Sequence, residues 1–256
     1  MKLLEGKKAL VLGIANKRSI AYGIAKVFKE HGAKIGMNYL NEKFEKKLKP
    51  LADELEAEIF AKLDVSTDED IENFFNIVKE TWGEVDIIVH SIAFANKEYL
   101  KGYYYLVDRQ SFLQAMDISV YSFTAIARQF LPIINEGGSL LTLSYYGAEK
   151  VVYNYNVMGV AKAALEASVK YLARDLGEIK KIRVNAISAG PIKTLAAAGI
   201  DQFSNIQKIS EERSPLKKSV SIEEVGNAAL FLCSDLGSGV TGEILHVDAG
   251  YNIIGM

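Results

Sequence analysis

Two tyrosines and a lysine in the second half of the chain have the residue types that proton transfer requires. Tyr155 and Lys162 are seven positions apart, and Tyr145 precedes them. On one helix, seven steps of about 100° come within roughly 20° of two full turns, so Tyr155 and Lys162 would share a face. An ammonium beside a phenol favours the phenolate and makes the tyrosine a better proton donor or oxyanion stabiliser. A helix with one half-buried tyrosine and one solvent-reaching lysine would show the same pattern, so the pair alone does not identify a site.

A strand and a helix are expected to position these residues. The stretch SLLTLSYY predicts a short apolar strand that contains Tyr145. Residues 154–176 have apolar side chains at three-to-four spacing, which predicts a helix that carries Tyr155 and Lys162. Period-two alternation along the strand places Ser144 and Tyr145 on opposite faces.

Length and composition are those of an ordinary globular protein. The 256 residues fit one α/β domain, and 49% hydrophobic with 24% charged residues allows a sizeable core. A net charge of −2 gives no overall field for nucleic acid or an anionic membrane. The apolar run ALVLGIA is too short to span a bilayer and lacks a signal-peptide cleavage pattern.

The chain has one cysteine and three histidines. The single cysteine, Cys233, excludes an intrachain disulfide and fits a reducing cytoplasm. The three histidines are scattered without ligand spacing, so we predict no metal site.

Predicted strands and helices alternate along the whole chain, which indicates one sheet covered by helices. We therefore expect a single Rossmann-type doubly wound α/β domain over residues 1–256, with a seven-stranded parallel sheet. Two S-x-x-E patterns, at Ser66 and Ser221, predict helix starts. Residues 195–215 are rich in small and polar residues with isolated apolar ones, so they are a candidate substrate-binding lid, although an ordinary surface helix and loop would fit as well. Its inward anchors would be Ile200 and Phe203.

The first strand-to-helix turn is where a doubly wound fold binds a dinucleotide. Gly13 ends the strand, and Ser19 is a plausible helix N-cap that would leave the N–H groups of Ser19 and Ile20 for a pyrophosphate. The spacing departs from G-x-G-x-x-G, and an ordinary strand-to-helix turn remains an alternative. At the end of the second strand, Leu40 stands near the position that chooses between NAD and NADP, with no acidic residue before Glu42 and no arginine for a 2′-phosphate.

Several of these stretches together resemble the short-chain dehydrogenase/reductase superfamily, and within it the bacterial enoyl-[acyl-carrier-protein] reductases. The resemblance is carried by GIANKRSIAYGIA, LSYYGAEK, NYNVMG and VNAISAGPIKTLAA, and by six residues between Tyr155 and Lys162 where most of the superfamily has three. It extends from GKKALVLGIA to GEILHVDAGY, nearly the whole chain.

The resemblance implies an NADH-dependent reduction of trans-2-enoyl thioesters on acyl carrier protein in fatty acid elongation, with NADPH not excluded. Tyr145, Tyr155 and Lys162 would be catalytic. The cofactor would be bound by Gly13, Ser19, Ile20, Leu40, Asp64, Val65, Ile92, Lys162, Ile192, Thr194 and Ala196. The substrate would contact Ala95, Tyr145, Tyr155, Ile200 and Phe203.

Two other functions remain open at this point. A 3-oxoacyl or other carbonyl reductase would share the fold and cofactor, but Tyr145 and the long gap between Tyr155 and Lys162 argue against it. A non-catalytic dinucleotide sensor would keep the glycine turn without needing those residues. Family members resemble one another in forming tetramers, and the apolar predicted helices 112–134 and 155–176 offer faces for two-fold packing. Acyl carrier protein is acidic, and Lys208, Arg213, Lys217 and Lys218 are the basic residues nearest the predicted lid.

Overall fold

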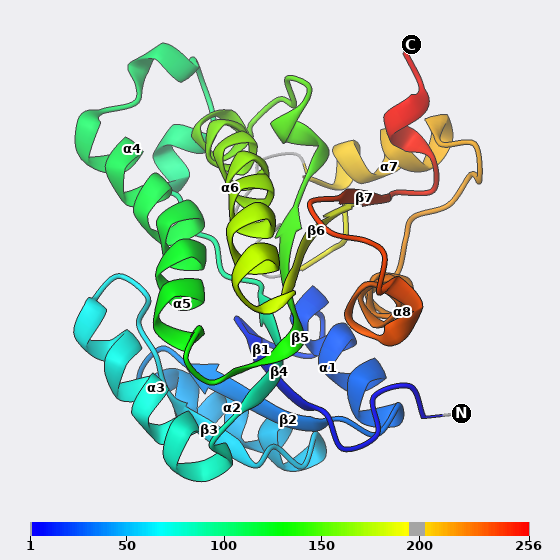
Figure 1. The fold of residues 1–256 in the computed structure, drawn as a ribbon. Coiled ribbons are helices and arrows are strands. Elements are labelled where there is room, and N and C mark those ends of the chain that lie inside the picture. The colour runs from blue at the N-terminus through cyan, green and yellow to red at the C-terminus, as the bar shows by residue number, and fades with distance from the viewer. Residues whose placement is uncertain (1, 195–202, 256) are drawn as a thin grey trace.

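The computed structural model describes residues 2–194 and 203–255 and has one parallel sheet between two layers of helices (Figure 1). The strand order is β3-β2-β1-β4-β5-β6-β7. This confirms the predicted seven-stranded, doubly wound α/β fold. The strands are β1 (Lys8–Leu12), β2 (Lys34–Tyr39), β3 (Ile59–Lys62), β4 (Val85–His90), β5 (Ile134–Ser144), β6 (Arg183–Ala189) and β7 (Ile244–Val247).

The helices cover both faces of the sheet, as a parallel sheet requires because its strands are apolar on both sides. α1, α2 and α8 pack on one face, and α3, α5 and α6 pack on the other (Figure 1). The helices are α1 (Ile20–Glu30), α2 (Glu42–Glu54), α3 (Asp68–Trp82), α4 (Arg109–Met116), α5 (Ser122–Phe130), α6 (Asn156–Lys180), α7 (Phe203–Arg213) and α8 (Ile222–Cys233). No helix in the described ranges combines the length and apolarity needed to cross a bilayer.

The strand register brings the carboxyl ends of four strands to one edge of the sheet. Leu12 of β1 pairs with His90 of β4, and His90 pairs with Thr142 of β5. Ser144 at the end of β5 pairs with Ser188 of β6. The loops that follow β1, β4, β5 and β6 therefore emerge side by side.

The predicted continuous helix over residues 112–134 is wrong. α4 and α5 are separated by a π-helical turn over Asp117–Tyr121. Ser119, in this turn, accepts a hydrogen bond from the backbone N–H of Phe94 and donates one to the Phe94 carbonyl, both at 3.0 Å. The interruption thus points a hydroxyl at the loop after β4, an arrangement in keeping with the frequent occurrence of π-turns at functional sites.

The predicted lid range is described from residue 203 onward. It contains α7, whose Gln207 donates to Ser219 Oγ at 3.1 Å. Ala196 and Ile200 lie outside the described residues, and for Phe203 only the backbone is described.

Candidate active site

A cavity of about 730 Å³ opens at the edge of the sheet where β1, β4, β5 and β6 end. Its lining brings together residues from all four following loops and from α6. Ten residues that the sequence predicts for the site line this cavity: Gly13, Ser19, Ile20, Ile92, Ala95, Tyr145, Tyr155, Lys162, Ile192 and Thr194.

The two predicted catalytic tyrosines are in contact. Their rings are 4.9 Å apart between centroids and inclined by 70°, an edge-to-face arrangement. Gly147 makes this possible, because a Cβ at that position would lie 2.4 Å from Cδ1 of Tyr155. Tyr155 is 8% exposed, so its hydroxyl is held within the protein rather than in solvent.

Tyr155 precedes the helix on which the sequence placed it. It is the N-cap residue of α6, between Asn154 with φ of 60° and Asn156 with φ of 33°. Asparagine is among the few side chains that visit this left-handed region. Nδ2 of Asn156 also donates to the carbonyl of Gly102 at 3.1 Å, which ties the start of α6 to the loop after β4.

The protonation state of Tyr155 differs from the one expected from the sequence. Burial, with smaller contributions from Tyr145 and Glu166, raises the pKa of Tyr155 well above its usual range. Burial likewise raises the pKa of Tyr145. The effect of desolvation on the phenol outweighs any attraction to an ammonium. The phenol of Tyr155 is therefore in its neutral form, which is able to donate a hydrogen bond.

Lys162 is the buried cation of the cavity. It lies in the second turn of α6, and Nζ donates to the carbonyl of Leu143 at 2.6 Å. Burial lowers the pKa of Lys162 to about 8, and Glu166 acts in the opposite direction. An ammonium has three donors. One is used by Leu143 within the described residues, which leaves donors for the hydroxyls of a bound ligand.

The turn after β1 approaches the end of β4 very closely. Gly13 has φ of 94°, and a Cβ there would lie 2.2 Å from the carbonyl oxygen of Ser91. Only glycine fits both the backbone conformation and this approach. The backbone N–H of Gly13 donates to Oδ1 of Asn38 at 2.9 Å, so β2 fixes the turn.

Ser19 closes the turn differently from the prediction. It is the N-cap of α1, as expected, but its hydroxyl accepts from the N–H groups of Ala15 and Asn16, both at 3.0 Å. Its own N–H donates to the carbonyl of Asn16 at 3.0 Å and so is not free for a phosphate. Within the described part of the chain, the N–H of Ile20 has no recorded acceptor and remains the candidate donor.

Leu40, Asp64 and Val65 follow β2 and β3 at the same edge of the sheet but do not line the cavity. Leu40 is 43% exposed, and Oδ1 of Asp64 accepts from the hydroxyl of Ser66 at 2.7 Å. The cofactor roles predicted for these three residues stay predictions, as does that of Ala196.

His90 and Glu166 are two buried or half-buried groups at this edge that the sequence did not single out. Nε2 of His90 is 2.8 Å from Ser122 Oγ, and Nδ1 is 3.3 Å from Thr142 Oγ1. Burial, with the charge of Lys162, lowers the pKa of His90 to about 3, so this ring is neutral. Glu166 accepts a hydrogen bond from Ser144. Neither residue is part of a recognisable sequence motif, because the side chains that they contact come from other helices and strands.

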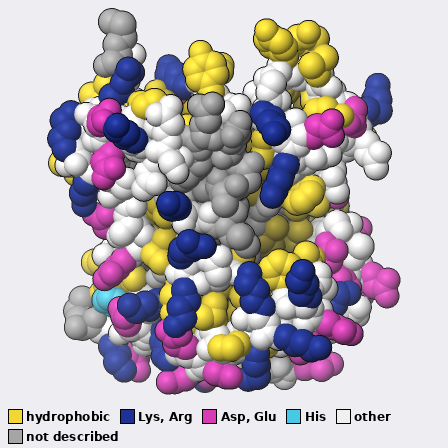
Figure 2. Space-filling view, turned by 180° about the vertical axis from the view of Figure 1, so that it is seen from behind, with side chains coloured by type: hydrophobic (Ala, Val, Ile, Leu, Met, Phe, Trp, Pro, Cys, Tyr) yellow, Lys and Arg dark blue, Asp and Glu magenta, His cyan; other side chains and the backbone are white. Residues whose placement is uncertain are grey.

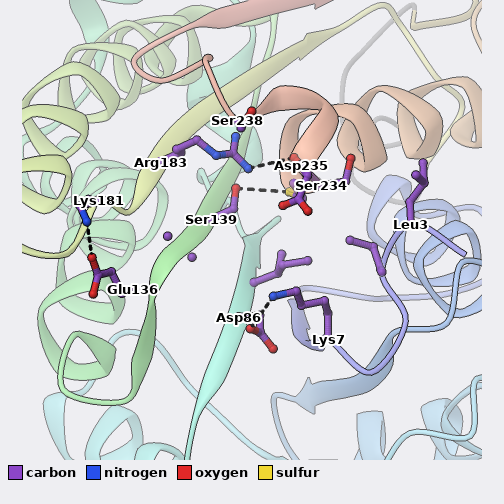
Figure 3. Close-up of a pocket in the computed structure, with 15 residues that line it drawn as sticks. Leu3, Lys7, Asp86, Glu136, Ser139, Lys181, Arg183, Ser234, Asp235 and Ser238 are labelled. Carbon is purple, nitrogen blue, oxygen red and sulfur yellow. Dashed lines mark hydrogen bonds and ion pairs between the residues drawn. The ribbon is translucent and has the colours of Figure 1, made fainter.

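A second cavity, of about 310 Å³, lies at the opposite edge of the sheet and is drawn in Figure 3. Its charged side chains are engaged with one another: Lys7 with Asp86 at 3.3 Å and Lys181 with Glu136 at 2.5 Å. Arg183 donates to backbone carbonyls (Figure 3). The described residues contain no cluster of three or more His, Cys, Asp or Glu that could hold a metal. The larger cavity is therefore the candidate active site.

The chain is similar to known proteins over nearly its full length. A family model described as enoyl-(acyl carrier protein) reductase matches residues 13–252. The chain is 56% identical over 254 residues to the enoyl-[acyl-carrier-protein] reductase (NADH) 1 of Rhizobium meliloti, which covers 99% of this chain and 93% of that protein. It is 51% identical over 257 residues to the corresponding NADH reductase of Bacillus cereus, with 100% of both chains covered.

Two solved structures are similar to this one. The Bacillus cereus enoyl-acyl carrier protein reductase with NADP⁺ and an indole naphthyridinone has a TM-score of 0.97, 51% identity and 100% coverage of both chains. The Anaplasma phagocytophilum reductase in complex with NAD has a TM-score of 0.94 and 50% identity, covering 99% of this chain and 95% of that one.

Proposed function

Because the chain belongs to the enoyl-[acyl-carrier-protein] reductase family, we propose that the cavity at the carboxyl edge of the sheet is its active site and that Tyr155, Tyr145 and Lys162 carry the reaction. The activity is the NADH-dependent reduction of trans-2-enoyl thioesters carried by acyl carrier protein, a step of fatty acid biosynthesis. The observation that carries the assignment of residues is the buried set of two touching tyrosines and a lysine in one cavity.

The residues around the cavity fit a nicotinamide dinucleotide. Gly13 allows the turn to approach the end of β4, Ile20 at the start of α1 lines the same cavity, and Lys162 has donors to spare. Bound NADH supplies the hydride that is added to the β-carbon of the substrate. Lys162 would hold the hydroxyls of the nicotinamide ribose, and its charge would favour negative charge developing nearby.

Tyr155 would stabilise the oxygen of the thioester. Its phenol is neutral and its position is fixed by Tyr145 and Gly147, so it can donate without reorganising as negative charge develops on that oxygen. A preorganised donor of this kind lowers the activation barrier by about 3 kcal/mol or more. Tyr145, whose ring packs against Tyr155, would support this geometry and form part of the acyl pocket.

The carbonyl-reductase alternative needs a serine hydroxyl aimed at the substrate. Here the hydroxyl of Ser144 donates to Glu166, and Tyr145 occupies the cavity beside Tyr155. NADH oxidation with a crotonyl thioester and with an acetoacetyl thioester, measured side by side, tests the proposal. We expect turnover of the crotonyl substrate only. Preferential turnover of the acetoacetyl substrate, or of neither, would refute the assignment.

We further propose that the carrier docks through basic residues near the predicted lid. Figure 2 shows lysine and arginine side chains gathered over the middle of one face, beside a hollow with hydrophobic side chains. Lys208 and Arg213 lie within the predicted lid range, and Lys217 and Lys218 follow it. Lys218 pairs with Glu224, and Nζ of Lys217 donates to the carbonyl of Glu212 at 2.6 Å, so both carry structural contacts as well.

Reversal of Lys217 and Lys218 to glutamate tests this docking surface. Charge-steered association weakens as salt rises. We therefore expect a higher KM for carrier-bound substrate with a flatter salt dependence, and nearly normal activity with a coenzyme A thioester. Equal losses with both substrates would mean that these lysines support the fold and that the carrier docks elsewhere.

We propose that the protein assembles as a homotetramer. Large apolar side chains stand exposed on α4, the π-turn and α6: Leu113, Tyr121, Val160 and Tyr171. Such faces are suited to two-fold packing against a second copy. Light scattering at micromolar concentration is expected to give the mass of four chains, and a monomeric mass would contradict the proposal.

A further inference from the structure

Glu166 and Lys162 occupy consecutive turns of α6 and are held by consecutive residues of β5. Glu166 follows Lys162 by four positions, so both side chains project from the same side of the helix. Nζ of Lys162 donates to the carbonyl of Leu143 at 2.6 Å. The hydroxyl of Ser144, the next residue, donates to Oε1 of Glu166. One strand end therefore fixes both charged groups.

Glu166 is half-buried and forms no ion pair within the described residues. Within residues 2–194 and 203–255, no lysine, arginine or histidine lies within ion-pair distance of its carboxylate. A carboxylate withdrawn from water in this way reduces folding stability. Burial raises the pKa of Glu166, although the hydrogen bond from Ser144 favours its charged form. Burial of this carboxylate is not expected to stabilise the fold, so we expect a role of Glu166 at the neighbouring Lys162.

The other charged groups around the pair come from three elements. Glu149 follows β5, His246 lies on β7, and Lys170 is one turn further along α6. His246 Nε2 is 2.7 Å from Glu149, so these two groups are engaged with each other. Lys162 is also near His90, which is neutral because burial lowers its pKa to about 3. Glu166 shares a face of α6 with Lys162, one turn away, and its negative charge favours the charged form of that lysine.

We propose that Glu166 is a positioning residue that holds Ser144 at the end of β5 and keeps the ammonium of Lys162 charged for cofactor binding. This inference rests on the proposed function, since it assumes that Lys162 contacts the cofactor. Burial works against the ammonium, and a carboxylate one turn away offsets that effect. Glu166 touches neither cofactor nor substrate in this account and acts through Lys162 and Ser144.

Glu166→Gln tests the inference, because the amide oxygen can still accept from Ser144 while the charge is lost. Lys162 is charged below its pKa and loses its charge as the pH rises through about 8. Without Glu166 that pKa falls further, so affinity for NADH should be lost at a lower pH than in the wild type. A hydrogen bond from a charged donor is stronger than one from a neutral donor, and the difference in free energy corresponds to about a fivefold change in Kd.

The measurement is a fluorescence titration of the full chain with NADH from mildly acid to alkaline pH. We expect the affinity of Glu166→Gln to match wild type at acid pH and to be about fivefold weaker near the midpoint of the wild-type profile. Glu178→Gln is the matched control, because it makes the same change at an exposed position of α6. His246→Gln should leave the alkaline limb in place and so separates the effect of that neighbour.

Ser144→Ala provides a second variant that keeps the carboxylate and removes its hydrogen bond. It should shift the alkaline limb less than Glu166→Gln does. An alkaline limb that stays where wild type has it in Glu166→Gln would overturn the inference. So would an equal loss of NADH affinity at every pH, which would indicate a purely structural role. The titration needs no substrate, so it remains decisive even if the crotonyl thioester proves not to be the substrate.

Discussion

The two cavities described above lie at opposite edges of the same sheet and differ in how their charges are partnered. At the amino edge, Asp86 accepts from Nζ of Lys7 at 3.3 Å, from the N–H of Lys8 at 2.9 Å and from Nδ2 of Asn135 at 3.0 Å. At the carboxyl edge, Lys162 is 7% exposed and has one backbone acceptor within the described residues.

The charged groups at the amino edge connect strands to one another, whereas we propose that the charged group at the carboxyl edge binds a ligand. Hydrogen-bonded pairs at the amino edge tie β1, β4 and β5 together, and a ligand there would have to break them. A buried ammonium with donors left over is unfavourable unless something else completes its shell. This is why we propose that a bound molecule completes the carboxyl edge, whereas the ion pairs and hydrogen bonds of the amino edge are made within the protein.

The largest effect is expected from Tyr155→Phe, which keeps the ring that packs on Tyr145 and removes the hydroxyl. Loss of one preorganised donor to a developing oxyanion should lower turnover by about 10²- to 10³-fold. Affinity for NADH should change little. Steady-state kinetics with a crotonyl thioester and a separate NADH titration measure the two quantities. Unchanged turnover would show that Tyr155 takes no part in the mechanism. The proposed difference between the two edges would then lose its main support.

Lys162→Met should have the next largest effect, and it should act first on cofactor binding. Methionine fills a similar volume and cannot donate to ribose hydroxyls. Loss of two hydrogen bonds from a charged donor should weaken NADH binding by roughly 10- to 100-fold. Because a buried ammonium is replaced by an apolar group, the melting temperature should not fall. A large fall in stability with unchanged affinity would make Lys162 a structural residue like those at the amino edge.

The sequence was sufficient to predict a seven-stranded, doubly wound parallel sheet and the convergence of most of the predicted site residues on one cavity. Alternating buried strands and amphipathic helices determine the doubly wound fold, and in such a fold the loops after β1, β4, β5 and β6 meet. The capping box at Ser221 and Glu224 is confirmed, because both of its hydrogen bonds lie within four residues of sequence. At the other pattern, Thr67 caps α3 instead, and Ser66 binds Asp64.

The details that could not be predicted depend on partners distant in the sequence. The π-turn between α4 and α5 places Ser119 against Phe94, and no local pattern records that pairing. The left-handed conformations of Asn154 and Asn156 put Tyr155 before α6 rather than in it. Glu166 looks like an ordinary polar position of a helix until Ser144 is found beside it. Burial decided the protonation of Tyr155, and burial is a property of the assembled fold.

At the amino edge, Arg183→Met should reduce stability and leave catalysis unchanged. The guanidinium is half-buried and donates to the carbonyls of Leu232, Ser234 and Val240, which join β6 to the end of α8. Leaving these acceptors without a donor should cost about 2–3 kcal/mol, which corresponds to a melting temperature lower by roughly 5–10 °C for a chain of this size. An altered KM for NADH would show that the two edges are coupled.

The smallest effect is expected from Lys7→Met, the amino-edge counterpart of Lys162→Met. The side chain of Lys7 is 51% exposed, and its partner Asp86 keeps two other donors after the change. An exposed ion pair contributes less than about 1 kcal/mol, and salt screens it further. Thermal melting should therefore shift by only a few degrees, and less at high salt, while NADH affinity stays at the wild-type value. If Lys7→Met weakened NADH binding as Lys162→Met is expected to do, the lysines at the two edges would be equivalent, and the distinction between the edges would be lost.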